Sequence, residues 1–127
     1  MTPEQIEILK TARHLIEQGW TQGNYARNAI GDRTDPAAEN AVCWCTLGAL
    51  RRASGFGIAL NHLVYCMEED RYRIETNYGV VTRRLIDCIP SHQGYTAGEL
   101  VSFNDAANRT KADVLKLFDD AIQGVSV

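Results

Sequence analysis

The chain has 127 residues, a length that fits one domain and is short for two. Hydrophobic residues make up 45% of it and charged residues 23%, a balance that excludes a disordered chain. The net charge of −3 argues against a dedicated nucleic-acid binder, and no apolar run approaches the roughly 20 residues that a membrane span needs.

Residues 3–19 are predicted to form an amphipathic helix. Thr2 is a favourable N-cap, Pro3 suits the first helical turn, and Gln5 completes a capping-box pattern. Gly19 is expected to end the helix. Apolar residues recur at helical spacing and form the expected buried stripe: Ile6, Leu9, Ala12, Leu15 and Ile16.

Residues 21–36 are a polar excursion that interrupts the helical pattern. A short β-hairpin is predicted at about 24–35, with Ile30–Asp32 at its tip and Tyr25–Asn28 and Arg33–Asp35 as its arms. A long loop is the alternative. Polar loops on a rigid scaffold often carry function, so this segment is a candidate interaction surface.

Residues 37–54 are predicted to form a second, largely buried helix that is opened by Pro36 and closed by Gly55. Its middle is almost entirely apolar, which indicates a central position in the fold. Within it, Gly48 is expected to permit a close crossing with another helix.

Three further helical stretches follow, at 58–70, at 78–89 and from Thr110 through Gln123. Pro90 stops the second of them, and Thr110 caps the third. Residues 100–105 are too short to assign. The sequence therefore predicts an all-α, mainly helical, single compact domain over residues 1–127, with five to six helices and a small β-hairpin.

The four cysteines give no metal or redox signature. Cys43 and Cys45 form a C-x-C pair, which fits neither a zinc knuckle nor a thioredoxin-type pair. His62 and Cys66 are four residues apart and share a helical face, but nothing local completes a ligand set. Buried thiols are the favoured interpretation. No metal site, no cofactor and no catalytic residue is predicted.

Two acidic groups are candidate contacts for a protein partner. Glu68, Glu69 and Asp70 form a continuous run, and Asp119 and Asp120 lie in the last helix. The alternative is that such a run is the solvated end of a helix.

The stretch 103–110 is the most patterned turn in the chain. Asn104 and Asp105 are expected to satisfy backbone groups at a helix end, and Arg109 is expected to pair with Asp105 across the turn. A hydrogen-bonded corner between two helices is the favoured interpretation. The alternative is a small-ligand pocket formed by His92, Asn104, Asp105 and Arg109.

Three blocks of sequence carry a resemblance to a known family. The chain resembles small uncharacterised proteins of bacteria and their phages, which share a tryptophan–cysteine–glycine–alanine–leucine helix and a C-terminal asparagine–aspartate corner. The resemblance covers residues 1–54 and 98–123, implies one compact domain of bacterial or phage origin, and supplies no catalytic residue. The positions that it marks are Trp20, Trp44, Cys45, Gly48, Asn104, Asp105 and Arg109.

We interpret the chain as a non-enzymatic protein-binding module, an inhibitor or regulator of a host protein complex. A small enzyme or small-ligand-binding protein is the alternative, and a homodimer is compatible with either. We expect no direct contact with nucleic acid and none with a membrane. The first residues lack the basic head and apolar block of a signal peptide, so the expected location is cytoplasmic.

Overall fold

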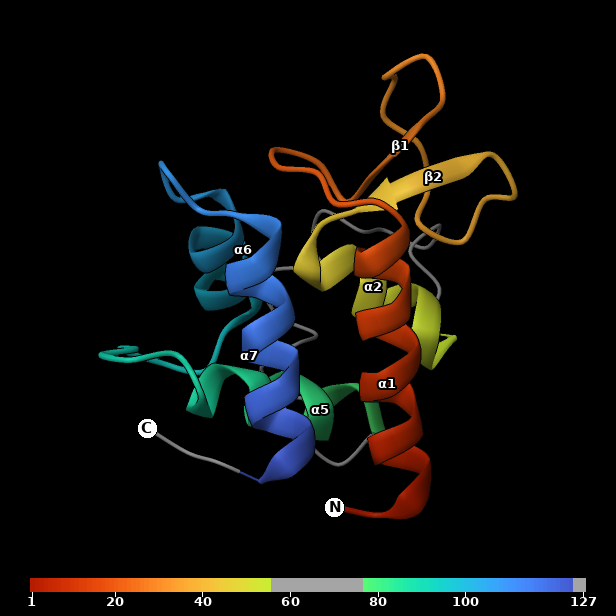
Figure 1. Cartoon of the computed structure of the whole chain (residues 1–127). Helices are drawn as coiled ribbons and strands as arrows, with labels where there is room; N and C mark the ends of the chain where they lie inside the picture. The colour runs from red at the N-terminus through yellow and green to blue at the C-terminus, as the bar shows by residue number, and fades with distance from the viewer. Residues whose placement is uncertain (56–76, 125–127) are drawn as a thin grey trace.

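The computed structural model describes residues 1–55 and 77–124, which fold into helices around one core with a small sheet at one end (Figure 1). The prediction of a mainly helical single domain is confirmed. The helix predicted at 58–70 lies outside the described residues. The described elements are α1 (Pro3–Gln18), β1 (Ala26–Asn28), β2 (Ala41–Trp44), α2 (Thr46–Ser54), α5 (Asn77–Asp87), α6 (Ala97–Asp105) and α7 (Lys111–Gln123).

Helix α1 forms as its local signals predict. The Thr2 hydroxyl accepts a hydrogen bond from the Gln5 amide at 3.2 Å, and the Gln5 side chain accepts one from the Thr2 amide at 2.9 Å. Two of the unpaired donors of the first turn are thereby satisfied. The helix lies beside α7 and also contacts α2 and α5 (Figure 1). Its buried residues are Ile8, Leu9, Ala12, Leu15 and Ile16.

The prediction of one helix over 37–54 is wrong in its first half. Residues 41–44 form strand β2, and α2 begins only at Thr46, after Cys45 in an extended conformation. Short apolar runs look alike in a buried helix and in a strand, because neither shows a polar face. Pairing with β1, which lies outside the run, decides between them.

Strand β1 pairs antiparallel with β2, so that Ala26 faces Trp44 and Arg27 faces Cys43. Of the predicted hairpin, the structure has the turn at the tip and a single antiparallel bridge between Arg27 and Arg33. The Thr34 amide also donates to Ala26 O at 3.0 Å. The pairing of β1 with β2 differs from the prediction, because the apolar run 41–44 forms a strand and not the first part of a helix.

Gly48 permits a close approach, but not the helix crossing that was predicted. A Cβ at this position would lie 2.0 Å from Tyr25 O and 2.8 Å from Tyr25 C. The polar excursion therefore crosses directly over the first turn of α2. Only glycine leaves room for that backbone.

Candidate functional site

Asn104, at the end of α6, is a fully buried junction between distant segments. Its Oδ1 accepts hydrogen bonds from Trp20 Nε1 at 2.8 Å, from the Thr46 amide at 2.9 Å and from the Thr46 hydroxyl at 2.8 Å. Its Nδ2 donates to Thr21 O at 3.0 Å and to Asp105 Oδ1 at 2.9 Å. The amide thus links α6 to the start of α2 and to the chain that leaves α1.

The main chain around Asn104 extends this junction. Gln22 Nε2 donates to Asn104 O at 2.9 Å and to Ala106 O at 3.2 Å, while the Gly23 amide donates to Asp105 Oδ1 at 3.0 Å. Both ends of the Asn104 amide are occupied by protein groups, so it has little remaining capacity for a ligand. The favoured interpretation of the corner as structural agrees with this arrangement.

The predicted ion pair between Arg109 and Asp105 does not form. Arg109 Nε donates instead to Phe103 O at 2.7 Å, and the guanidinium stacks 3.8 Å above the centroid of the Phe103 ring. The Asp105 carboxylate accepts hydrogen bonds from the Gly23 amide and from Asn104 Nδ2 instead. Arg109 therefore faces a different part of the surface.

His92 lies in the connection between α5 and α6 and contacts Tyr95 of the same connection. Its ring centroid is 4.9 Å from that of Tyr95. The Tyr95 hydroxyl donates to Asp87 Oδ1 at 2.6 Å, which raises the pKa of Tyr95, and the Arg83 guanidinium lies 3.9 Å from the Tyr95 ring centroid. Among the contacts of the described residues, none joins His92 to the Asn104 corner.

Arg109 lines an open groove of about 220 Å³ beside α7. Its charged lining is Arg109, Asp113, Lys116 and Asp120. Its apolar lining is Cys88, Pro90, Phe103 and Leu117. The groove brings together Asp120, which was predicted to contact a protein partner, and Arg109, which was predicted to line a small-ligand pocket. It does not include the other residues of that predicted pocket, Asn104, Asp105 and His92.

The acidic candidates in α7 are engaged in ion pairs. Asp119 receives two hydrogen bonds from Arg13 of α1, at 2.6 and 3.3 Å, and Asp120 pairs with Lys116 at 2.8 Å. These contacts raise the pKa of Arg13 and of Lys116. Asp119 thus ties α7 to α1. The other acidic group, Glu68, Glu69 and Asp70, lies outside the described residues, as do His62 and Cys66.

Cys45 has a local structural role as the N-cap of α2. Its Sγ accepts a hydrogen bond from the Gly48 amide at 3.3 Å. Burial raises the pKa of the Cys45 thiol to about 11, so it stays protonated at neutral pH. Within residues 1–55 and 77–124, no group of three or more His, Cys, Asp or Glu side chains is arranged to hold a metal ion.

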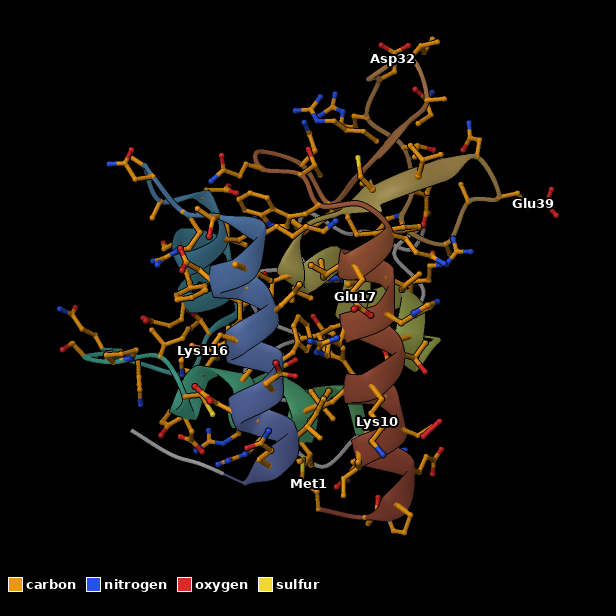
Figure 2. The ribbon with its side chains drawn as sticks, viewed as in Figure 1. Met1, Lys10, Glu17, Asp32, Glu39 and Lys116 are labelled. Atoms are coloured by element: carbon orange, nitrogen blue, oxygen red, sulfur yellow. The ribbon has the colours of Figure 1, made fainter. Side chains whose placement is uncertain are left out.

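The chain between β1 and Thr34 forms a loop that projects from the sheet end of the molecule; Figure 2 shows Asp32 at its far end, away from the helices. Ile30 at this tip is 82% exposed, the largest exposure of any large apolar side chain in the described part of the chain. The sequence predicts Ile30 at the tip of the hairpin but does not mark it as a contact. The available signal was a single large apolar residue, between Ala29 and Gly31, in an otherwise polar stretch.

The projecting loop is held by its own hydrogen bonds. Asn28 Oδ1 accepts from the Ile30 amide at 3.1 Å and from the Asp32 amide at 3.0 Å. Asn28 N donates to Asp32 O at 2.8 Å, and Arg27 Nη1 donates to Gly31 O at 2.9 Å. Gly31 adopts a φ of 89°, which glycine accepts without strain. The loop therefore presents Ile30 from a fixed backbone.

Comparison with known proteins gives a family and no activity. A family model described as a family of unknown function (DUF6197) matches residues 1–124. No curated protein and no solved structure matches the chain. None of the helices in the described residues has the length and apolar character needed to cross a membrane.

Proposed function

The chain belongs to the DUF6197 family of unknown function, and on that premise we propose that it is a non-enzymatic module that binds another protein through the loop Asn28–Thr34. The observation that carries the proposal is the exposure of Ile30, 82%, at the tip of a loop held by its own hydrogen bonds.

Ile30 is far more exposed than the other large apolar side chains at the surface of the described residues. The other exposed large apolar side chains in the described ranges are Met1, Val42 and Val101, at 49, 46 and 37%. Burying an isoleucine side chain in a partner contributes about 1.5–3 kcal/mol. One such anchor in the centre of a small interface is typical of protein contacts.

The hydrogen bonds within the loop reduce the entropy that binding would cost. A loop that already has its bound conformation loses little freedom on association, so more of the contact energy appears as affinity. Arg27 supports the base of the loop from below, with Nε donating to Thr21 Oγ1 at 3.0 Å. Thr21 O in turn accepts a hydrogen bond from Asn104 Nδ2 at 3.0 Å, so the polar excursion is also tied to the buried junction at Asn104.

Charged side chains lie next to the apolar tip on one side. Asp32 and Arg33 follow it in sequence, and Figure 2 shows Glu39 apart from Asp32, on the connection that leads to β2. An apolar centre with a polar rim is the usual composition of a protein interface. The partner surface that fits is an apolar pocket bordered by polar groups. In its narrower form, the proposal is that occupying this pocket inhibits or regulates a protein complex.

A pull-down from native lysate tests the proposal with a matched pair of variants. Ile30→Asp places a charge at the loop tip, and Val101→Asp places the same charge on an exposed position of α6. We expect a stoichiometric partner with the wild-type chain and with Val101→Asp, and its loss with Ile30→Asp. Retention by Ile30→Asp, or no partner with the wild-type chain, contradicts the proposal.

Salt separates this contact from one made by the acidic residues. An apolar anchor is insensitive to ionic strength, whereas exposed charges are screened beyond about 8 Å at physiological salt. We expect the captured partner to survive an increase in salt that would release a contact made by Asp119 and Asp120. Asp119→Asn serves as the corresponding variant, and it should leave the capture unchanged.

A further inference from the structure

We propose that the groove beside α7 binds a small organic carboxylate, with the guanidinium of Arg109 as its anchor. This site is independent of the Ile30 loop and does not rest on the proposed function. Three observations carry it: the fixed orientation of Arg109, the compensation of the other charges in the groove, and the apolar walls.

Arg109 is held in place before any ligand arrives. Its Nε donates a hydrogen bond to Phe103 O at 2.7 Å, and its Cζ lies over the Phe103 ring, 3.8 Å from the centroid. Its two η nitrogens make no hydrogen bond to the described residues, and no carboxylate there lies within 4 Å of it. Two parallel N–H groups in a fixed plane match the two oxygens of a carboxylate.

The remaining charges in the groove are already compensated. Lys116 and Asp120 neutralise each other at 2.8 Å. Asp113 accepts the Thr110 amide at 3.0 Å and lies in the first turn of α7, where the helix dipole favours a negative charge. Arg109 is therefore the charge in the groove to which residues 1–55 and 77–124 bring no carboxylate within 4 Å, and an anion completes it.

The walls select the rest of the ligand. Pro90, Phe103 and Leu117 contribute apolar surface to a space of about 220 Å³, which suits a compact apolar body and is too small for a folded segment. The combination of a guanidinium fork and apolar walls favours a carboxylate on a short ring or branched chain over an inorganic anion.

Benzoate is the probe, and benzamide is its neutral control of nearly the same shape. In two-dimensional NMR titrations of the full chain at constant ionic strength, we expect benzoate to shift the Arg109 side-chain Nε–H signal and the amides of the groove. The expected Kd is about 1 mM, as for a small fragment. Benzamide should bind at least about tenfold more weakly, because it lacks the charge that Arg109 meets.

Arg109→Lys keeps the charge and removes the planar fork, so benzoate should bind about tenfold more weakly to it. Arg83→Lys, at an arginine whose guanidinium lies over the Tyr95 ring and which is not part of the groove lining, is the matched control and should bind as the wild type does. Equal binding of benzoate and benzamide, or shifts spread over other arginines, overturns the proposal. The comparison of the two probes needs no variant, so it holds even where a substitution unfolds the chain.

Discussion

Replacing Asn104 by alanine is expected to lower the free energy of unfolding by about 3–5 kcal/mol. The substitution removes the acceptor of the Thr46 amide and of Trp20 Nε1, and the donor to Thr21 O. Each buried polar group left without a partner costs about 1–3 kcal/mol, and the half-buried Trp20 recovers part of its loss by binding water. The total is a large fraction of the 5–15 kcal/mol that typically stabilises a domain.

Urea titrations followed by tryptophan fluorescence and far-UV circular dichroism measure this cost. Asn40→Ala is the matched control, because Asn40 is exposed and accepts only a surface hydrogen bond from Thr34. Its expected effect is within about 0.5 kcal/mol. A loss below about 1 kcal/mol for Asn104→Ala would refute the view that this amide joins the fold together.

Asn104→Asp separates the two halves of the amide. It keeps the acceptor that faces Trp20 and Thr46, but it replaces the donor with an oxygen that faces Thr21 O and Asp105 Oδ1. We expect it to destabilise the fold in spite of its almost unchanged volume, because a buried charge then lies beside a second carboxylate. Wild-type stability in this variant at pH 7 would show that the donor half contributes nothing.

Further predictions concern packing, titration and capping. Gly48→Ala should lower the free energy of unfolding by about 3 kcal/mol, because its Cβ would lie 2.0 Å from Tyr25 O. Gly98→Ala, whose Cβ would have no contact closer than 3.4 Å, should change the free energy of unfolding by less than about 1 kcal/mol, and equal urea midpoints of the two variants would contradict the steric argument. Burial raises the pKa of Cys45 to about 11, above its ordinary value of 9.0, so its contribution to stability is complete below pH 9 and is lost as the pH rises to 11. Over that range the wild type should lose about 2–3 kcal/mol more than Cys45→Ala, and parallel pH profiles would argue against a buried thiol. Thr110→Ala should cost about 1 kcal/mol in the same urea assay by removing the cap of α7, and no change would mean that water replaces the cap fully.

The parts of the fold that were predicted correctly have signals within a few residues of one another. Thr2 with Gln5 marks the start of α1, and Thr110 with Asp113 marks the start of α7. Gly124, with a φ of 81°, marks the end of α7. These features depend on backbone groups of the same turn, so the sequence alone is enough to place them.

The candidate surfaces were predicted only in part. The polar excursion was predicted as a candidate interaction surface, and this stays a prediction. Its strand pairing was not predicted, because β2 lies in an apolar run that has no helical or strand period. Arg109 was recognised as a notable residue with the wrong partner. Arg109 donates to Phe103 O, whereas the Asp105 carboxylate accepts from Asn104 Nδ2. Only the positions of these groups in space decide which of the possible contacts form.

The sequence by itself determined a single, mainly helical domain, the ends of α1 and α7, and a polar excursion between the first two helices. Tertiary structure decided that Asn104 meets Trp20 and Thr46, which are 84 and 58 residues away along the chain. It also decided that Gly48 makes room for the backbone of Tyr25, and that Arg109 lines a groove beside Asp120. The physical reason is that a cap or a helical stripe needs neighbours within one or two turns, whereas a buried amide or an open guanidinium takes its role from groups that only the complete fold brings near.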